Sequence, residues 1–363
     1  MKLRVALTIE QCWHEVPGGT AVAALGMARG VEATGEADVV GVSAAHRGPP
    51  RDPWVPAFEV RRLPLPRIAL YESWHRLRRP AVERATGPVD VVHATAFPTP
   101  PRSAPLVLTI HDLAWIEDPT HFTARGLGFF KRGLDLALRD ADLVTCPSEA
   151  TRADCVEQGF APERVRVVPL GVDPSPASAA QVDEVRHRYG LGRPYVLWAG
   201  TIEPRKNLPR LLAAYRQLDR DVDLVLVGPK GWNEDLDALL GGDRERVHVL
   251  GFVPAADLPP LYAGAAVFCF PSLMEGFGFP VLEAMAQGTP VVTSQGTSTQ
   301  ELAEGAGVLV DPRDASSIAG GLAAVLDDEA RSAELASAGR QRAQSYTWER
   351  TGRMLVDAYR EVL

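Results

Sequence analysis

The residues with the clearest chemical potential in this 363-residue chain are two glutamates beside a glycine-bearing loop. Glu275 precedes Gly276 and Gly278, and Glu283 lies in a helix that we predict to begin at Pro280. Glycines allow a ligand to approach the backbone closely, and a helix N-terminus favours a phosphate. Carboxylates accept hydrogen bonds from hydroxyl groups. We place Glu283 in the first turn of the helix and expect both carboxylates to reach one volume, suited to a sugar or ribose beside a phosphate.

A second chemical feature is the adjacent pair Arg205 and Lys206. The pair follows a predicted strand at 195–200 and precedes an amphipathic helical pattern. Arginine binds phosphate through a bidentate fork and lysine acts as a point charge, so together they could neutralise a diphosphate. Asn207 is predicted to cap the helix that follows.

Two histidines stand at the ends of predicted strands in the first half of the chain. His111 ends the strand 106–111 and could donate a hydrogen bond to a bound sugar or stabilise developing charge. The alternative is a structural imidazole bonded to a loop carbonyl. His93 is a weaker candidate for contact with an acceptor.

The elements that must position these residues alternate between strands and helices. Predicted strands of the first half lie at 3–8, 37–43, 58–63, 89–93, 106–111, 142–146 and 164–168. Those of the second half lie at 195–200, 223–228, 246–250, 266–270, 290–293 and 307–310. Such alternation predicts an α/β fold with doubly wound parallel sheets, in which ligands bind beyond the carboxyl ends of the strands.

The stretch 275–283, Glu-Gly-Phe-Gly-Phe-Pro-Val-Leu-Glu, resembles the signature of retaining nucleotide-sugar glycosyltransferases of the GT-B fold. The branch that it resembles is the large bacterial family that includes mannosyltransferases (glycosyltransferase family 4, glycosyl transferases group 1). The resemblance implies two facing Rossmann-like domains with a central cleft, and a C-terminal helix that crosses back to the first domain.

The resemblance also assigns roles to individual positions. It implies that Glu275 contacts the donor sugar, that Glu283 holds the ribose, and that Arg205 and Lys206 clamp the diphosphate. His111 would lie near the reacting sugar. The remaining donor-binding positions that it implies are Gly18, Gly19, Gly200, Val253, Gly276, Phe277 and Gly278. For Gly18 and Gly19, a simple connection between the first strand and a helix at 20–33 remains equally open.

The expected organisation has four segments. Residues 1–171 form an acceptor-side domain, 172–193 a Pro-, Ser- and Ala-rich linker with a leading helix, 194–345 a nucleotide-sugar-binding domain, and 346–363 the crossover helix.

The resemblance implies transfer of a hexose with retention of anomeric configuration, by same-face attack assisted by the leaving phosphate. Mannose from GDP-mannose is the expected donor, with UDP-sugars as the nearest alternative. We expect no cofactor and no divalent metal, because the cation pair already supplies positive charge. Asp-x-Asp sequences occur at 140–142, 221–223 and 235–237, where turn or cap roles suffice for the first two. The acceptor, whether glycan, glycolipid or small metabolite, stays open.

Composition limits the class of protein. The chain is 46% hydrophobic and 23% charged, which is typical of a globular protein, and its net charge of −8 argues against nucleic acid as a partner. The four cysteines lack metal-ligand or redox spacing and are expected to be buried thiols, which fits a cytoplasmic location. No segment carries the ~20 apolar residues that cross a bilayer.

Residues 61–79 contain six arginines interleaved with apolar and aromatic residues. This segment could contact the cytoplasmic face of the inner membrane, although an exposed helix with extended arginines is the favoured interpretation.

Three other functions remain to be separated from transfer. A nucleotide-sugar epimerase would share the fold but need no acceptor, and a non-catalytic paralogue would bind glycans only. A Rossmann oxidoreductase is disfavoured, because the chain has no Gly-x-Gly-x-x-Gly motif.

Overall fold

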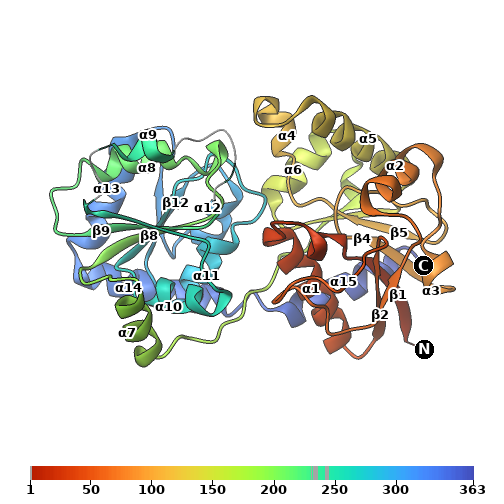
Figure 1. The fold of residues 1–363 in the computed structure, drawn as a ribbon, viewed down its shortest axis with the longest axis horizontal. Coiled ribbons are helices and arrows are strands. Elements are labelled where there is room, and N and C mark those ends of the chain that lie inside the picture. The colour runs from red at the N-terminus through yellow and green to blue at the C-terminus, as the bar shows by residue number, and fades with distance from the viewer. Residues whose placement is uncertain (1, 230, 232–235, 242–244) are drawn as a thin grey trace. The chain divides into compact units, whose positions relative to one another are not determined.

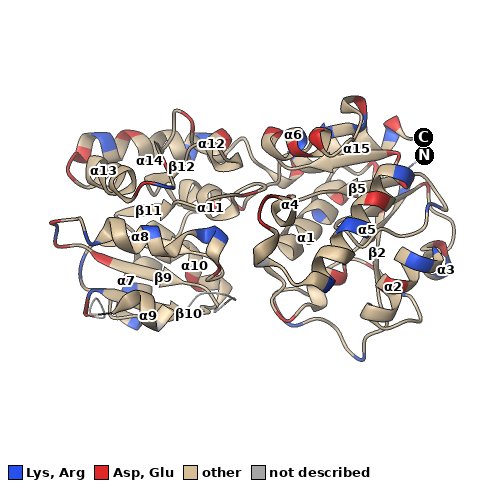
Figure 2. Cartoon of the chain, turned by 90° about the horizontal axis from the view of Figure 1, so that it is seen from above, with Lys and Arg blue, Asp and Glu red and all other residues tan. Residues whose placement is uncertain are grey.

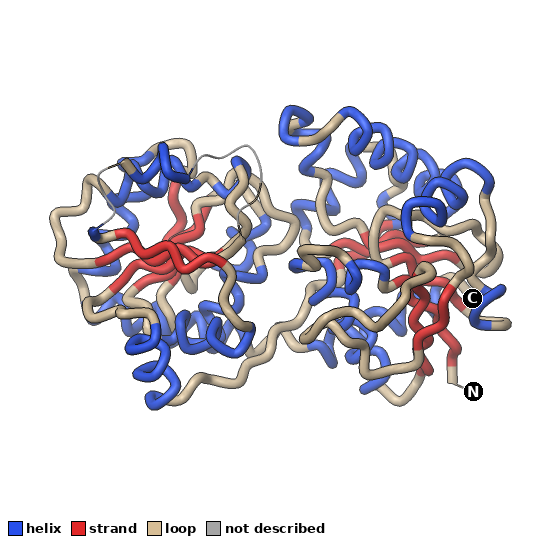
Figure 3. The backbone as a smooth tube through the Cα atoms, in the orientation of Figure 1, coloured by secondary structure: helices blue, strands red, loops and turns tan. Residues whose placement is uncertain are grey.

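The computed structural model describes the chain except for residues 1, 230, 232–235 and 242–244. The described chain forms two compact units. The first comprises Met1–Gly171 together with Tyr346–Leu363, and the second comprises Val172–Ser345. In each unit a parallel sheet is covered by helices (Figures 1 and 3).

The first unit is built on a seven-stranded parallel sheet with the order β3-β2-β1-β4-β5-β6-β7. Its strands are β1 (Leu3–Thr8), β2 (Ala37–Ser43), β3 (Val60–Arg62), β4 (Val91–Ala94), β5 (Leu106–Thr109), β6 (Leu143–Cys146) and β7 (Val165–Val167). The sequence order reverses between β1 and β4, which both pair in parallel. This reversal is the switch point where doubly wound sheets place ligands.

Helices of the first unit connect these strands. They are α1 (Gly18–Ala33), α2 (Arg67–Leu77), α3 (Glu83–Thr86), α4 (Ala114–Glu117), α5 (Ala124–Asp140) and α6 (Glu149–Glu157). Short 3-10 turns add to them, including η1 (Glu10–Trp13) directly after β1. The predicted start of the first helix at residue 20 is wrong, because Gly18 and Gly19 already form the first turn of α1.

The second unit contains a six-stranded parallel sheet with the order β10-β9-β8-β11-β12-β13. Its strands are β8 (Tyr195–Ala199), β9 (Asp223–Val227), β10 (Val247–Gly251), β11 (Val267–Phe270), β12 (Val291–Ser294) and β13 (Val308–Val310). Here the order reverses between β8 and β11, which pair directly. The loops that leave these two strands therefore emerge side by side.

The described helices of the second unit surround this sheet. They are α7 (Ala179–Arg188), α8 (Leu208–Tyr215), α9 (Leu236–Leu240), α10 (Leu258–Ala263), α11 (Phe279–Gln287), α12 (Ser298–Ala303), α13 (Ala315–Leu326) and α14 (Glu329–Ala343). The strands of both sheets are mostly uncharged, whereas charged side chains lie mainly on helices and loops (Figure 2). Buried aromatic residues such as Trp74 and Trp198 anchor the two cores.

The last helix, α15 (Trp348–Glu361), belongs to the first unit and packs along α1. Glycines allow this packing. A Cβ on Gly30 would lie 2.1 Å from the carbonyl oxygen of Trp348, and a Cβ on Gly352 would lie 2.0 Å from that of Gly30. The two helix backbones are thus in direct contact, as the implied crossover of the C-terminal helix requires.

Candidate active site

The candidate site of the second unit begins with the loops after β8 and β11. Arg205 and Lys206 lie in a 3-10 turn after β8, and Glu275 lies in the loop between β11 and α11. Because β8 and β11 are neighbours at the switch point, residues 69 apart in sequence come into contact. The structure therefore brings together three side chains to which the family resemblance assigns roles in donor binding.

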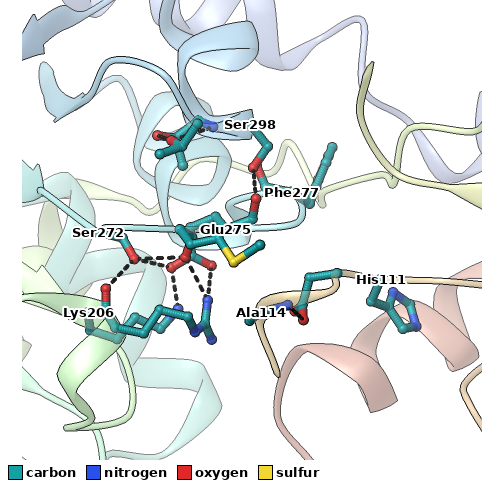
Figure 4. A network of polar contacts seen from close by, with 12 residues as sticks. His111, Ala114, Lys206, Ser272, Glu275, Phe277 and Ser298 are labelled. Carbon is teal, nitrogen blue, oxygen red and sulfur yellow. Dashed lines mark hydrogen bonds and ion pairs between the residues drawn. The ribbon is translucent and has the colours of Figure 1, made fainter. Parts of the chain in front are cut away.

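Glu275 is the centre of an ion cluster (Figure 4). Lys206 Nζ lies 2.6 Å from Glu275 Oε1, and Arg205 Nη1 lies 3.0 Å from Glu275 Oε2. Arg205 Nη2 also pairs with Glu203 Oε1 at 2.8 Å. The Glu275 and Lys206 side chains are only 8% and 11% exposed. Two cations and two carboxylates are thus held together in a nearly buried cluster, so a bound diphosphate would compete with carboxylates for the same cations.

The electrostatic effects within this cluster can be assigned to their sources. Burial raises the pKa of Glu275, but Arg205 and Lys206, aided by hydrogen bonds from Lys206 and Ser272, outweigh burial and lower that pKa from 4.5 to about 2. Burial and the neighbouring Arg205 lower the pKa of Lys206, although Glu275 opposes this shift. Glu275 is consequently ionised at neutral pH and can accept hydrogen bonds from sugar hydroxyls.

Two serines that were not among the predicted site residues hold the Glu275 loop. Ser272 Oγ donates to Glu275 Oε1 at 2.6 Å and orients the carboxylate. Ser298 Oγ donates to the carbonyl of Glu275 at 2.6 Å and lies 3.2 Å from that of Phe277 (Figure 4). An isolated serine forms no sequence motif that would indicate a function. The position of Ser272 shortly after a buried strand could still have suggested a role.

Gly276, Phe277 and Gly278 form the predicted loop between Glu275 and α11. Gly278 is the N-cap of α11 with φ +106°, and a Cβ there would lie 2.7 Å from Thr299 Cγ2. Glycine is therefore required at Gly278 both by conformation and by space. Pro280 lies in the first turn of α11, where its missing N–H has little cost, but it is the second helical residue and not the predicted first.

Glu283 lies in the second turn of α11, so its predicted place in the first turn is wrong. The helix begins at Phe279, one residue earlier than Pro280, which moves Glu283 to the fifth helical position. Its Oε2 accepts a hydrogen bond of 2.9 Å from Tyr262 Oη. Burial raises the pKa of Glu283, and the bond from Tyr262 lowers it in part. Glu283 is not part of the ion cluster around Glu275, and its partner Tyr262 was not among the predicted site residues.

Asn207 precedes α8, but its side chain does not cap that helix as predicted. The residue has a left-handed backbone with φ +60°. Its Nδ2 donates to the carbonyl oxygens of Pro271 at 2.8 Å and Pro312 at 2.7 Å. Asn207 therefore links three loops at this edge of the sheet.

Two further predicted donor-binding positions lie at the same edge. Gly200 follows β8, and a Cβ on the neighbouring Gly228 would lie 1.9 Å from the carbonyl oxygen of Gly200. Val253 follows β10 and has a buried side chain, so only its backbone could contact a base.

The remaining predicted residues belong to the first unit. Gly18 and Gly19 are exposed at the start of α1. His111 follows β5, which ends at Thr109, and its Nε2 lies 2.9 Å from the carbonyl oxygen of Thr95. A carbonyl only accepts, so Nε2 carries the proton. Burial lowers the pKa of His111, so the ring is neutral and its Nδ1 accepts hydrogen bonds. A hydrogen bond from Nδ1 to a sugar would need the protonated imidazole, so that role of His111 stays a prediction, whereas the alternative, a bond to a loop carbonyl, is present in the structure.

His93 is fully buried, with Nδ1 2.8 Å from Tyr359 Oη and Nε2 2.7 Å from Thr109 Oγ1. Both ring nitrogens therefore have partners inside the core. The suggestion that His93 contacts an acceptor is wrong for this structure.

The Asp-x-Asp sequences that the structure describes have structural partners. Asp142 receives a bidentate bond from Arg102 and the N–H of Leu106, and Asp223 lies near Arg193 and His248. Asp235 of the third sequence lies outside the described residues. Within the described part of the chain, no group of three acidic, histidine or cysteine residues is arranged to hold a metal ion.

The arginine-rich segment 61–79 contains the last two residues of strand β3 and the whole of helix α2, which ends at Leu77. Trp74 is buried, whereas Ile68 and Leu77 are exposed. Arg78 is structural, since it donates to the carbonyl of Pro100 and to Asp140 at 2.7 Å each. Among the described residues, no helix has the length and apolar character needed to span a bilayer.

The two parallel-sheet Rossmann-like units define an α/β protein of the GT-B class. Solved structures share this fold over nearly the whole chain. The Anabaena protein Alr3699/HepE, solved with UDP and glucose, matches with a TM-score of 0.77 at 21% identity, covering 99% of this chain and 100% of that one. WaaG, a glycosyltransferase involved in lipopolysaccharide biosynthesis, matches with a TM-score of 0.74 at 20% identity, covering 98% of this chain and 99% of that one.

The sequence then defines the family. Residues 17–176 match Glycosyltransferase Family 4, and residues 182–342 match Glycosyl transferases group 1. O-antigen chain mannosyltransferase B from Escherichia coli is 33% identical over 281 residues, covering 74% of each chain. A D-inositol 3-phosphate glycosyltransferase from Salinispora tropica is 33% identical over 79% of this chain and 67% of its own length. The chain belongs to this glycosyltransferase family and is a glycosyltransferase.

Proposed function

We propose that the enzyme transfers mannose from GDP-mannose to a hydroxyl group of a glycan, glycolipid or small metabolite, with retention of configuration and without a divalent metal. The observation that carries this proposal is the placement of Arg205 and Lys206 against Glu275 at the switch point of the second sheet. Mannosyltransferases among the relatives support the choice of sugar. The proposed donor site lies in the second unit. Its other donor-binding positions are Gly200, Val253, Glu283 and the loop 276–278.

In the proposed reaction, the acceptor oxygen attacks the anomeric carbon on the face from which the nucleoside diphosphate departs. The bond from carbon to phosphate oxygen breaks, and the acceptor proton passes to the leaving phosphate. Negative charge grows on the phosphate oxygens, so Arg205 and Lys206 stabilise the transition state more than the ground state. Glu275 would orient the sugar through its hydroxyls, and His111 would accept a hydrogen bond through Nδ1.

Donor choice is tested by thermal shift with GDP, UDP, ADP, TDP and their sugar derivatives. A ligand at a hundred times its Kd stabilises the fold by about 2.7 kcal/mol. We expect GDP and GDP-mannose to give the clear shift and Arg205→Ala to abolish it. A shift with UDP alone would support a UDP-sugar donor, the second candidate, for which HepE with bound UDP and glucose is the structural precedent. No shift with any nucleotide would favour a non-catalytic paralogue.

Transfer itself is tested by GDP release with and without acceptor. Release that requires acceptor supports transfer, whereas sugar conversion without acceptor would indicate an epimerase. NMR of the product anomer tests retention. Activity that is lost in EDTA and restored by Mn²⁺ or Mg²⁺ would overturn metal independence.

We also propose a cytoplasmic location, supported by four cysteines that are all buried free thiols. Peripheral contact of segment 61–79 with the inner membrane is tested by pelleting with anionic vesicles. Binding that disappears at high salt would support contact, and the absence of pelleting would exclude it.

A further inference from the structure

A hollow in the first unit lies beside its edge strand β3 and includes Arg61 and Arg62 of the arginine-rich segment. Its volume is about 650 Å³, within the range of pockets that bind small molecules. The loop between β2 and β3, strand β3 itself and α3 form its walls. The residues that line it are Trp13, Pro49, Pro50, Val55, Pro56, Phe58, Val60, Arg61, Arg62, Arg84 and Ala85. We call this hollow the β3 groove.

All charged residues that line the β3 groove are basic. Three arginines line it, and none of its lining residues is acidic. Arg62 and Arg84 have no carboxylate partner among the described residues. Arg61 pairs with Glu59, but both side chains are more than half exposed, and such surface pairs neutralise charge weakly. An anion that entered the groove would therefore meet guanidinium groups with no competing carboxylate in the lining.

The guanidinium of Arg62 is held in place before any ligand arrives. It donates to the carbonyl oxygens of His46 at 2.9 Å and Gly48 at 3.3 Å. These acceptors are neutral, so they fix the group without cancelling its charge. Trp13 Nε1 donates to the same Gly48 carbonyl at 3.0 Å. The β2–β3 loop is thus tied both to the edge strand and to Trp13.

This arrangement extends to the carboxyl end of β1. The Trp13 ring stacks on His46 at 4.8 Å with an interplanar angle of 8°. His46 Nε2 lies 2.8 Å from Glu10 Oε1, and Glu10 Oε2 accepts from the N–H of Ala44 at 2.8 Å. Glu10 is buried directly after β1. The groove wall is therefore fixed to the switch point of the first sheet, the edge where such sheets bind ligands.

We infer that the β3 groove binds a phosphate group carried by the acceptor, and that the acceptor is accordingly a phosphorylated glycan or glycolipid. Arginine forks match phosphate oxygens in bidentate geometry, and the prolines, Val55 and Phe58 would contact the uncharged part of the ligand. This inference deepens the proposed function and rests on it, because the ligand of the groove is an acceptor only if the enzyme transfers a sugar. The binding of phosphate in the groove does not depend on which donor the second unit takes.

The experiment is calorimetric titration of the full chain with glucose 1-phosphate and, for comparison, methyl glucoside, which lacks the phosphate. Variants are Arg84→Gln and the double variant Arg62→Gln/Arg84→Gln, with Arg353→Gln, an exposed helical arginine of the same unit, as the matched control. Arg205→Ala serves to remove binding at the donor site.

We expect glucose 1-phosphate to bind to the wild type and to Arg205→Ala, about tenfold more weakly to Arg84→Gln, and not measurably to the double variant. Arg353→Gln should bind as the wild type does, and binding should weaken as salt rises. Arg62 also fixes the loop, so circular dichroism must show that the double variant is folded. Arg84→Gln leaves those bonds intact and keeps the test decisive. Equal binding by wild type and Arg84→Gln, or loss only in Arg205→Ala, would overturn the inference.

A second arm identifies the source of the phosphate. Pelleting with phosphatidylcholine vesicles that contain phosphatidic acid, compared with phosphatidylcholine alone, measures capture of a lipid phosphate. Pelleting that is lost in Arg84→Gln supports a lipid headgroup, and binding of glucose 1-phosphate alone supports a soluble phosphorylated glycan. Failure of both arms overturns the site. The thermal shift with GDP should be the same in the double variant, so a failed donor site and a failed groove give different results.

Discussion

The substitution Lys206→Met tests whether Glu275 depends on its cations as the structure indicates. The fall in the pKa of Glu275 from 4.5 to about 2 corresponds to about 3 kcal/mol, at about 1.4 kcal/mol per pKa unit. Arg205, Lys206 and Ser272 share this stabilisation. We expect Lys206→Met to lower the free energy of unfolding by about 2–3 kcal/mol, because a buried carboxylate loses its partner at 2.6 Å.

A double-mutant cycle with Glu275→Gln isolates the interaction. The single change Glu275→Gln leaves two cations near Glu203 alone and should cost about 3 kcal/mol. The double variant should lose about 2 kcal/mol less stability than the sum of the losses in the two single variants. Urea unfolding followed by circular dichroism and tryptophan fluorescence measures this, since Trp198 in β8 is fully buried. Lys131→Met, an exposed lysine of α5, is the control and should change stability by less than about 0.5 kcal/mol.

The pH dependence of the same variants gives an independent check. The folded-state pKa of Glu275 is lowered, so its contribution is complete above about pH 4.5 and is lost as the pH falls toward 2. The stability difference between wild type and Glu275→Gln should therefore shrink across that window. Additivity of the two single changes within about 0.5 kcal/mol, or a difference that does not vary below pH 4.5, would refute this account of the cluster.

Three further changes test other parts of the structure. Tyr262→Phe removes the hydroxyl that donates to buried Glu283, so it should lower stability by about 1–3 kcal/mol and raise the pKa of Glu283 further. The midpoint of pH-dependent GDP binding should then move to higher pH. An unchanged midpoint would contradict this role of Tyr262. Asn207→Ala removes two hydrogen bonds to carbonyls and strains a left-handed backbone, so chemical unfolding should show a loss of about 2–4 kcal/mol, with Asn207→Gly less affected. Gly30→Ala should lower the melting temperature through a clash that costs at least about 1–3 kcal/mol, whereas Gly128→Ala on α5, where a Cβ meets only Arg132 at 3.5 Å, should be neutral or stabilising.

The sequence predicted the strands whose ends carry the candidate donor site, but it did not predict the strand order that brings those ends together. Arg205 follows one buried strand and Glu275 follows another, and the reversal of strand order makes those strands neighbours. The alternation of apolar segments predicted the α/β class. The central residues of the strands were predicted, but the residues at which the strands begin and end were not. The strand ending in Thr109 shows the limit, since Ile110 continues the apolar pattern but has already left β5.

The parts that the sequence did not reveal depend on side-chain directions across the fold. The Asn207 side chain could cap the helix that follows it or bond to carbonyls distant in sequence. It donates to Pro271 and Pro312 because the folded loops place those carbonyls within reach. Ser272, Ser298 and Tyr262 contact the site through single hydroxyls, which leave no periodic pattern. His111 was located near the end of its strand, but its tautomer follows from one carbonyl oxygen of Thr95.

The packing of α15 on α1 has a consequence for the order in which the chain is synthesised. The first unit is interrupted by the whole of the second, so α1 emerges from the ribosome more than 300 residues before its partner helix. Until Trp348 arrives, Gly26 and Gly30 on α1 have no helix against them. The second unit is continuous in sequence and has no such dependence. The nascent chain can therefore complete the later unit first, and the earlier one becomes whole only when its final helix is released.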